Sequence, residues 1–161
     1  MITQERLRQV AQYNEQTGEF IRIQKVKGKR AGQVMGSRRH DGYIRIRIDK
    51  HFFYGHRLAW FWCTNTWPEG EIDHIDGNPA NNAIANLRPV AREVNQQNIR
   101  KAQSNNATGL LGVCLTSKGD KFRATITVNK TQIYLGTFPS PEEAHVKYLE
   151  AKRRLHEGCT I

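Results

Sequence analysis

The segment GEIDHIDGNPANNAIANLRPVAREVNQQN, residues 70–98, contains the features that decide the fold and the chemistry of this chain. Residues 71–75 have the alternating pattern of a strand, and the DGNP sequence that follows is typical of a turn in which Gly77 tolerates a positive φ. The sequences NAIANL and AREVNQQNIRKA then have helical patterns. We therefore predict a strand, a turn and helical structure that folds back on the strand.

Asp73 and His74 are neighbours on this predicted strand, so their side chains point to opposite faces and serve different purposes. Phosphodiester hydrolysis needs a base that activates water, a divalent metal ion that stabilises the phosphate, and a group that holds the base in one tautomer. His74 is suited to be the base, and Asp73 together with a helical asparagine offers hard oxygen ligands for Mg²⁺ or Mn²⁺. A further asparagine can hydrogen-bond the imidazole, whereas Asn78, Asn81 and Asn82 are expected to shape the turn and cap the helix.

The remaining chain has clear local patterns on both sides of this segment. A short helix with Thr3 as its N-cap is expected first, and GYIRIRIDKHFF predicts a strand with a turn at Asp49 and Lys50. The sequence HRLAWFWCTNT predicts a buried helix, and residues 103–109 read as a linker. Beyond it, three strand patterns precede a helix that Ser140 caps and Pro141 opens.

Composition points to a polyanionic partner. The chain has 161 residues, 25 Lys and Arg against 15 Asp and Glu, a formal net charge of +10 and a pI of about 9.9. By our count, residues 1–40 have a net charge of +6, residues 71–106 of zero and residues 107–161 of +3, so a neutral centre lies between two basic parts suited to bind phosphates. Three cysteines without a C-x-x-C pair favour a reduced, intracellular (cytoplasmic) setting, and the longest apolar run, LAWFWC, is too short to cross a bilayer.

The asparagine-rich segment closely resembles the HNH endonucleases of the ββα-metal class, in the subgroup of phage and intron-borne homing endonucleases. These show a D-H-I-D-G-N turn, an N-L pair and a later asparagine, and the upstream GYIRIRIDKHFFYGHRLAWFW also fits them. By position, the resemblance implies that His74 is the general base, Asn86 orients it, and Asp73 and Asn95 bind the metal, with Asn98 as the alternative ligand. Many members have a histidine where this chain has Asn95.

Residues 109–158 resemble the APETALA2/ethylene-response-factor type of DNA-binding domain, in which a three-stranded sheet lies in the major groove. The matching sequences include FRATI, YLGTF and the glutamate-alanine pair near the start of the last helix. On the strand KFRATITV one set of alternating side chains faces the helix, and the other set is expected to contact DNA: Lys121, Arg123, Thr125 and Thr127. Where plant members have arginines on the first strand, this chain has Leu111 and Cys114.

Together these observations predict an α+β protein with a ββα-metal nuclease domain at 1–102, a linker at 103–109 and an APETALA2-like domain at 110–161. We expect a site-specific, Mg²⁺- or Mn²⁺-dependent endonuclease of the homing type, a monomer or weak dimer, which acts on double-stranded DNA and not on a small molecule or a membrane. Arg45 and Arg47 are expected to contact that DNA. The alternatives are a non-catalytic DNA-binding regulator derived from such a nuclease and, less supported because exposed aromatic pairs are missing, an RNA-binding protein.

Overall fold

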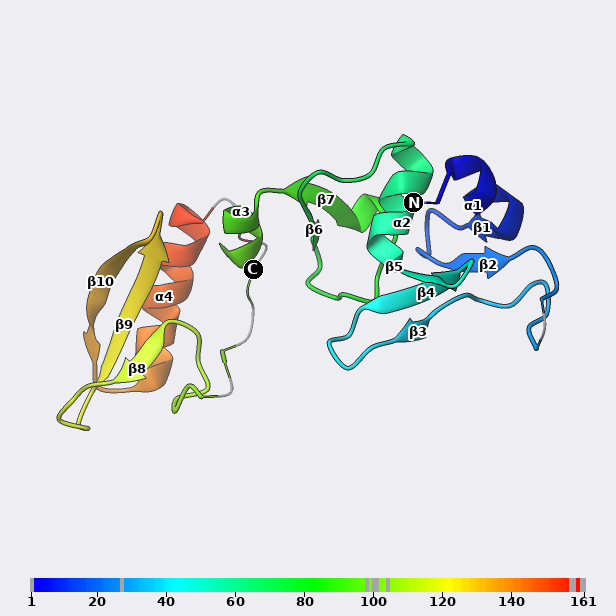
Figure 1. Cartoon of the computed structure of the whole chain (residues 1–161). Helices are drawn as coiled ribbons and strands as arrows, with labels where there is room; N and C mark the ends of the chain where they lie inside the picture. Colours follow the sequence, from blue (N-terminus) through cyan, green and yellow to red (C-terminus); the bar gives the residue numbers. More distant parts are fainter. Residues whose placement is uncertain are drawn as a thin grey trace. The chain divides into compact units, whose positions relative to one another are not determined.

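The computed structural model describes residues 2–26, 28–97, 99, 102–103, 105–156 and 159. Contacts within the chain divide it into two compact units, Met1–Arg92 and Glu93–Ile161, each with its own hydrophobic core (Figure 1). Both units combine helices with small antiparallel sheets, which confirms the predicted α+β class. The division falls near residue 92 rather than at 103–109, and the exact domain boundaries stay a prediction.

The N-terminal unit begins with a short helix and two small antiparallel sheets. In chain order these elements are α1 (Gln4–Val10), β1 (Ala11–Tyr13), β2 (Phe20–Arg22), β3 (Ser37–Arg38), β4 (Ile44–Ile48) and β5 (His51–Tyr54). Thr3 caps α1 as predicted, because its hydroxyl accepts the backbone N–H of Arg6 at 3.1 Å. The strands β4 and β5 form a hairpin whose turn has positive φ at Asp49 (46°) and Lys50 (70°), again as predicted.

Helix α2 (Gly55–Thr64) follows β5 directly and organises the core of this unit. Leu58 and Ala59 on its apolar face are completely buried, so the buried helix expected from HRLAWFWC is confirmed. The helix contacts α1, β4 and β5, and it ends where Asn65 takes the left-handed conformation. Because α2 is fixed on three sides, it is a rigid support for the hairpin that follows.

That hairpin consists of β6 (Glu71–His74) and β7 (Leu87–Val90), joined by a loop that ends in the 3₁₀ turn η1 (Ile84–Asn86). The predicted helix over NAIANL is therefore wrong, since this sequence forms only one 3₁₀ turn before the chain enters β7. Pro89 lacks the N–H that a helix would need and disfavours helical backbone in the residue before it. The next predicted helix is present as α3 (Arg92–Gln97), while residues 98, 100 and 101 lie outside the described part.

The C-terminal unit is a three-stranded sheet in the order β10-β9-β8, with α4 on one face (Figure 1). Its elements are β8 (Val113–Leu115), β9 (Phe122–Val128), β10 (Thr131–Phe138) and α4 (Pro141–Leu155). Ser140 caps α4 as predicted, accepting the N–H of Glu143 at 3.2 Å. Ala124 and Ile126 of β9 are buried against this helix, which confirms the predicted inward face of the strand.

Candidate active site

Asp73 and His74 are consecutive residues at the end of β6 in the β6–β7 hairpin. In the antiparallel register Asp73 lies opposite Arg88, and His74 lies opposite Leu87. Both side chains are buried, each with 5% of its surface exposed. The alternation of a strand sends them to different surroundings, an ion pair for Asp73 and a cluster of rings for His74.

His74 is oriented by a hydrogen bond from its ring. Its Nε2 lies 3.2 Å from Oδ1 of Asn82, and the Nδ2 of the same amide donates to the carbonyl of Ala80 at 3.4 Å. The amide oxygen of Asn82 therefore faces the ring, and an oxygen of this kind can only accept. Nε2 of His74 is consequently the protonated nitrogen, and Nδ1 is the basic one.

Asn82 is itself held firmly, with 2% of its surface exposed. The hydroxyl of Tyr13, from β1, donates to its backbone carbonyl at 2.7 Å. Two glycines make room for it: a Cβ at Gly18 would lie 2.2 Å from the carbonyl carbon of Asn82, and one at Gly55 would lie 2.7 Å from its Nδ2. The position of the amide that faces His74 is thus set by two parts of the sequence distant from it, residues 13–18 and Gly55.

Asn86 organises the loop between the two strands. Its Oδ1 accepts the backbone N–H of Asp76, and its Nδ2 donates to Oδ1 of Asp76 and to the carbonyl of Asn81, each at 2.9 Å. Asn81 in turn donates to the other carboxylate oxygen of Asp76 at 2.7 Å. These contacts of Asn86 therefore fix the backbone next to Asn82, and it is Asn82 whose amide is bonded to the imidazole of His74.

Asp73 forms a buried ion pair with the residue opposite it. Both Nε and a terminal nitrogen of Arg88 donate to Oδ2 of Asp73, at 2.9 and 2.7 Å. Arg88 is partly exposed, so the pair connects the interior of the hairpin with its surface. Charge-assisted bonds of this kind orient a carboxylate strongly, and they offset part of the cost of its burial.

Three aromatic and imidazole rings cluster at the candidate base. The ring of His56, from the start of α2, lies 5.3 Å from that of His74 at an angle of 79°, and Tyr43 lies 5.8 Å from His74. Tyr54 stacks on His56 with the ring centres 5.5 Å apart. Among the described residues nothing hydrogen-bonds Nδ1 of His56, which is buried. His56 and the two tyrosines therefore separate the inner side of His74 from water.

This environment keeps both imidazoles neutral. Burial lowers the pKa of His74 below its ordinary value of 6.5, although the hydrogen bond with Asn82 and the carboxylate of Asp76 oppose the shift. Burial also lowers the pKa of His56, to about 3, and the nearby His74 and Arg57 add to that effect. A neutral imidazole at pH 7 is the form that accepts a proton.

The predicted metal ligands lie on different elements. Asp73 is in the hairpin, whereas Asn95 is on α3 and belongs to the second unit, so their sharing of an ion stays a prediction. The alternative ligand Asn98 lies outside the described residues. Within the described ranges no three His, Cys, Asp or Glu side chains group together as metal ligands. A Mg²⁺ ion bound to nucleic acid needs only one or two protein ligands, because phosphate and water complete its shell.

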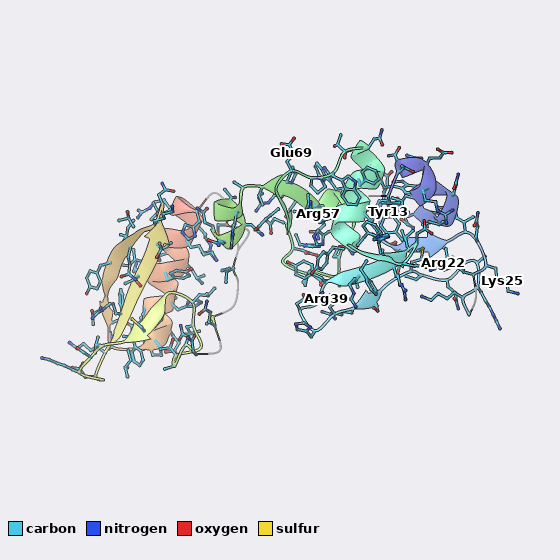
Figure 2. All side chains as sticks on the ribbon, in the orientation of Figure 1. Tyr13, Arg22, Lys25, Arg39, Arg57 and Glu69 are labelled. Atoms are coloured by element: carbon cyan, nitrogen blue, oxygen red, sulfur yellow. The ribbon has the colours of Figure 1, made fainter. Side chains whose placement is uncertain are left out.

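The predicted DNA contacts are on the surfaces of both units. Arg45 and Arg47 alternate with the buried isoleucines of β4, and Arg47 is exposed. Figure 2 shows further basic side chains of the N-terminal unit, Arg22, Lys25 and Arg39, along β2 and the chain on either side of β3. In the second unit the expected contacts all lie on or next to β9, away from α4: Lys121, Arg123, Thr125 and Thr127.

Several contributors to this site have no clear signal of their own in the sequence. Asn82 is predictable as a turn residue, but its bond to His74 depends on Tyr13, which is 69 residues away. Arg88 is identifiable only once the β6–β7 pairing is known. His56 is buried against His74, a contact that no local sequence pattern indicates.

Comparison with known proteins relates this region to a nuclease family. Residues 53–97 match the sequence profile of a family described as HNH endonuclease. The chain is also 36% identical over 78 residues to Protein 3.8 of Escherichia phage T7, an alignment that covers 48% of this chain and 64% of that protein. No solved structure matches, and no helix in the described ranges has the length and apolar character needed to cross a membrane. Residues 53–97, which include Asp73, His74, Asn86 and Asn95, are therefore similar to an HNH endonuclease domain.

Proposed function

We propose that this chain is a site-specific, divalent-metal-dependent DNA endonuclease of the homing type. The observation that supports this most directly is the neutral, oriented imidazole of His74, which is adjacent in the hairpin to the ion-paired carboxylate of Asp73. The HNH match over residues 53–97 and the net charge of +10 both agree with a nuclease that acts on double-stranded DNA.

In this proposal His74 is the general base. Its Nδ1 accepts a proton from the water that attacks the phosphorus atom, while its Nε2–H remains bonded to Asn82. The bond to Asn82 stabilises the imidazolium that results, because the partner is an oxygen. Asn86 has a positioning role and acts through the loop, since it holds the carbonyl of Asn81 next to Asn82. Removing Asn86 is therefore expected to disorder the orientation of the base.

Asp73 and Asn95 would hold the metal ion, Mg²⁺ or Mn²⁺. The donor set fits such an ion, because a carboxylate and an amide both offer hard oxygens and Arg88 orients the carboxylate of Asp73. When bound, the ion supplies positive charge that stabilises the phosphate and the leaving oxygen. The neutral imidazole of His74 adds no repulsion to a cation bound beside it.

The basic surfaces would bind and position the DNA. Arg45 and Arg47 in the first unit contact phosphates, and the outward face of β9 contacts base edges in the manner of an APETALA2-like domain. Support for the second assignment is the observed architecture, a three-stranded sheet with one helix on its back, together with the exposed Arg123. We expect the protein to act as a monomer or weak dimer.

The test of this function compares the wild-type chain with His74→Ala on supercoiled plasmid and phage-like genomic DNA in the presence of Mg²⁺. Loss of the base should slow cleavage by about 10²- to 10⁴-fold and leave DNA affinity nearly unchanged. His51→Ala is the matched control, because His51 is an exposed histidine at the start of β5. This variant should cleave DNA at the wild-type rate. A wild-type chain that binds DNA but cuts none with either Mg²⁺ or Mn²⁺ would instead be the non-catalytic DNA-binding regulator.

A further inference from the structure

An exposed phenylalanine lies among the arginines on the outer face of the β4–β5 hairpin. Phe52 pairs with Arg47 across the two strands, and 55% of its surface is exposed. The guanidinium carbon of Arg45 lies 4.1 Å from the centre of the Phe52 ring, and that of Arg47 lies 5.6 Å from it. Two cations and one aromatic ring thus form a single surface feature, which we call the Arg-Phe row.

The Arg-Phe row has no acidic partner of its own. In the part of the chain that the structure describes, neither Arg45 nor Arg47 forms an ion pair, and the nearest acidic turn residue, Asp49, is paired with Arg6 at 2.7 Å. No carboxylate therefore neutralises either guanidinium; Arg47 is exposed, whereas Arg45 is half-buried and its Nε is buried. A large apolar ring kept in water between two cations is typical of surfaces that track a nucleic-acid strand and stack on its bases.

This surface is continuous with the candidate active site. Tyr43, two residues before Arg45, has its ring 5.8 Å from His74, and Tyr54, which pairs with Arg45, lies 5.8 Å from Tyr43. From Tyr43 to Arg47 is four steps of strand, roughly 13 Å at the usual rise. A DNA strand advances about 3.4 Å per nucleotide, so this length corresponds to about four nucleotides.

We propose that the Arg-Phe row binds an unstacked nucleobase: Phe52 stacks on the base, and Arg45 and Arg47 contact the phosphates beside it. The base lies about four nucleotides from the scissile phosphate. The position of this base relative to the cut rests on the proposed nuclease function, in which the DNA passes His74. The binding of a base by the Arg-Phe row does not depend on that function. Phe52 thereby contributes an uncharged contact to DNA, whereas the neighbouring arginines contribute ionic contacts.

The experiment measures DNA affinity over a range of salt concentrations, with a chelator present so that no variant can cut. The full-length chain, Phe52→Ala, Phe52→Leu and Arg47→Ala are titrated into a fluorescently labelled duplex. Val34→Ala is the matched control, because Val34 is another exposed apolar side chain of the same unit, at 58% exposure. The same duplexes, with 2-aminopurine at successive positions, report whether a base leaves the stack.

Loss of a stacked base should weaken binding by about 5- to 150-fold for both Phe52 variants without changing the slope of log affinity against log salt. Arg47→Ala should lower that slope by about 0.9, and Val34→Ala should change neither quantity. The 2-aminopurine signal should rise at one position with the wild-type chain and not with Phe52→Leu. Unchanged affinity in Phe52→Leu, or a Phe52→Ala variant that alters the salt slope as Arg47→Ala does, would overturn the stacking role. Failure of cleavage alone would contradict the proposed function and leave this result intact.

Discussion

Acid should destabilise the N-terminal unit through the buried imidazole of His56. In the unfolded chain this group has an ordinary pKa near 6.5, and in the folded state burial lowers its pKa to about 3. The folded pKa is depressed, so the stabilising contribution of neutral His56 is fully present above pH 6.5 and is lost as the pH falls from 6.5 towards 3. The rings of Tyr43, Tyr54 and His74 pack around His56, and Arg57 adds positive charge.

The magnitude follows from the two pKa values. At pH 5 His56 is protonated in the unfolded chain and neutral in the folded chain. The pH has then fallen about 1.5 units below the unfolded pKa of 6.5. Each unit corresponds to about 1.4 kcal/mol, so His56 alone should remove about 2 kcal/mol of unfolding free energy between pH 7 and pH 5. The pKa of His74 is also lowered, so it adds loss in the same direction.

The assay is urea denaturation at pH 7 and pH 5 for the wild-type chain and for His56→Gln, which has no titrating group. The variant should lose about 2 kcal/mol less than the wild type between the two pH values. An NMR titration of the wild-type ring provides a check that does not need the variant to fold: its resonances should stay at the neutral position down to pH 5. Equal losses in both proteins, together with a ring that titrates near pH 6.5, would refute the argument from burial.

Other substitutions test the remaining contacts. Asn82→Ala should lower kcat by about 10- to 100-fold at unchanged DNA affinity, and ¹⁵N shifts of the His74 ring should reveal a mixture of tautomers; a ring that stays protonated at Nε2 would disprove the orienting role. Asp73→Ala should require more Mg²⁺ for half-maximal cleavage, and an unchanged titration curve would count against the ligand. Gly112→Ala should destabilise the C-terminal unit by about 1–3 kcal/mol, because a Cβ there would lie 1.9 Å from the ring of Tyr148 at a φ of 71°. Arg123→Ala should lower site selectivity more than the rate at a single site, and equal selectivity would remove β9 from recognition.

Sequence alone predicts the elements whose signals are local. The strand β4 has three isoleucines on one face, and α4 has a serine cap followed by proline, so both can be identified from short patterns. The strand β7 is different, because four residues that include Pro89 have no clear strand pattern of their own. The strand β7 forms because it pairs with β6, and this pairing exists only once the hairpin has folded. Residues around Asn86 consequently look helical in sequence and are not.

Some residues of the candidate site can likewise be predicted from the sequence, and others cannot. Asp73 and His74 are visible in the sequence because they are adjacent and precede a recognisable turn. The amide that faces His74 belongs to Asn82, and its choice among several nearby asparagines depends on the hydroxyl of Tyr13 and the absence of side chains at Gly18 and Gly55. These contacts join parts of the chain that are distant in sequence, so no local pattern could have selected Asn82.

The charges of the site follow a consistent physical logic. A phosphate that approaches a bare, buried carboxylate would be repelled, yet the paired guanidinium of Arg88 neutralises Asp73 before any cation arrives. The imidazoles of His56 and His74 are neutral because they are buried, so they neither repel a divalent ion nor compete for the phosphate. Positive charge is instead found at Arg45 and Arg47, where counterions would leave if DNA binds as proposed. In the proposed function this arrangement would separate DNA binding, which would depend on surface cations, from proton transfer, which would depend on the neutral ring of His74 held in one tautomer.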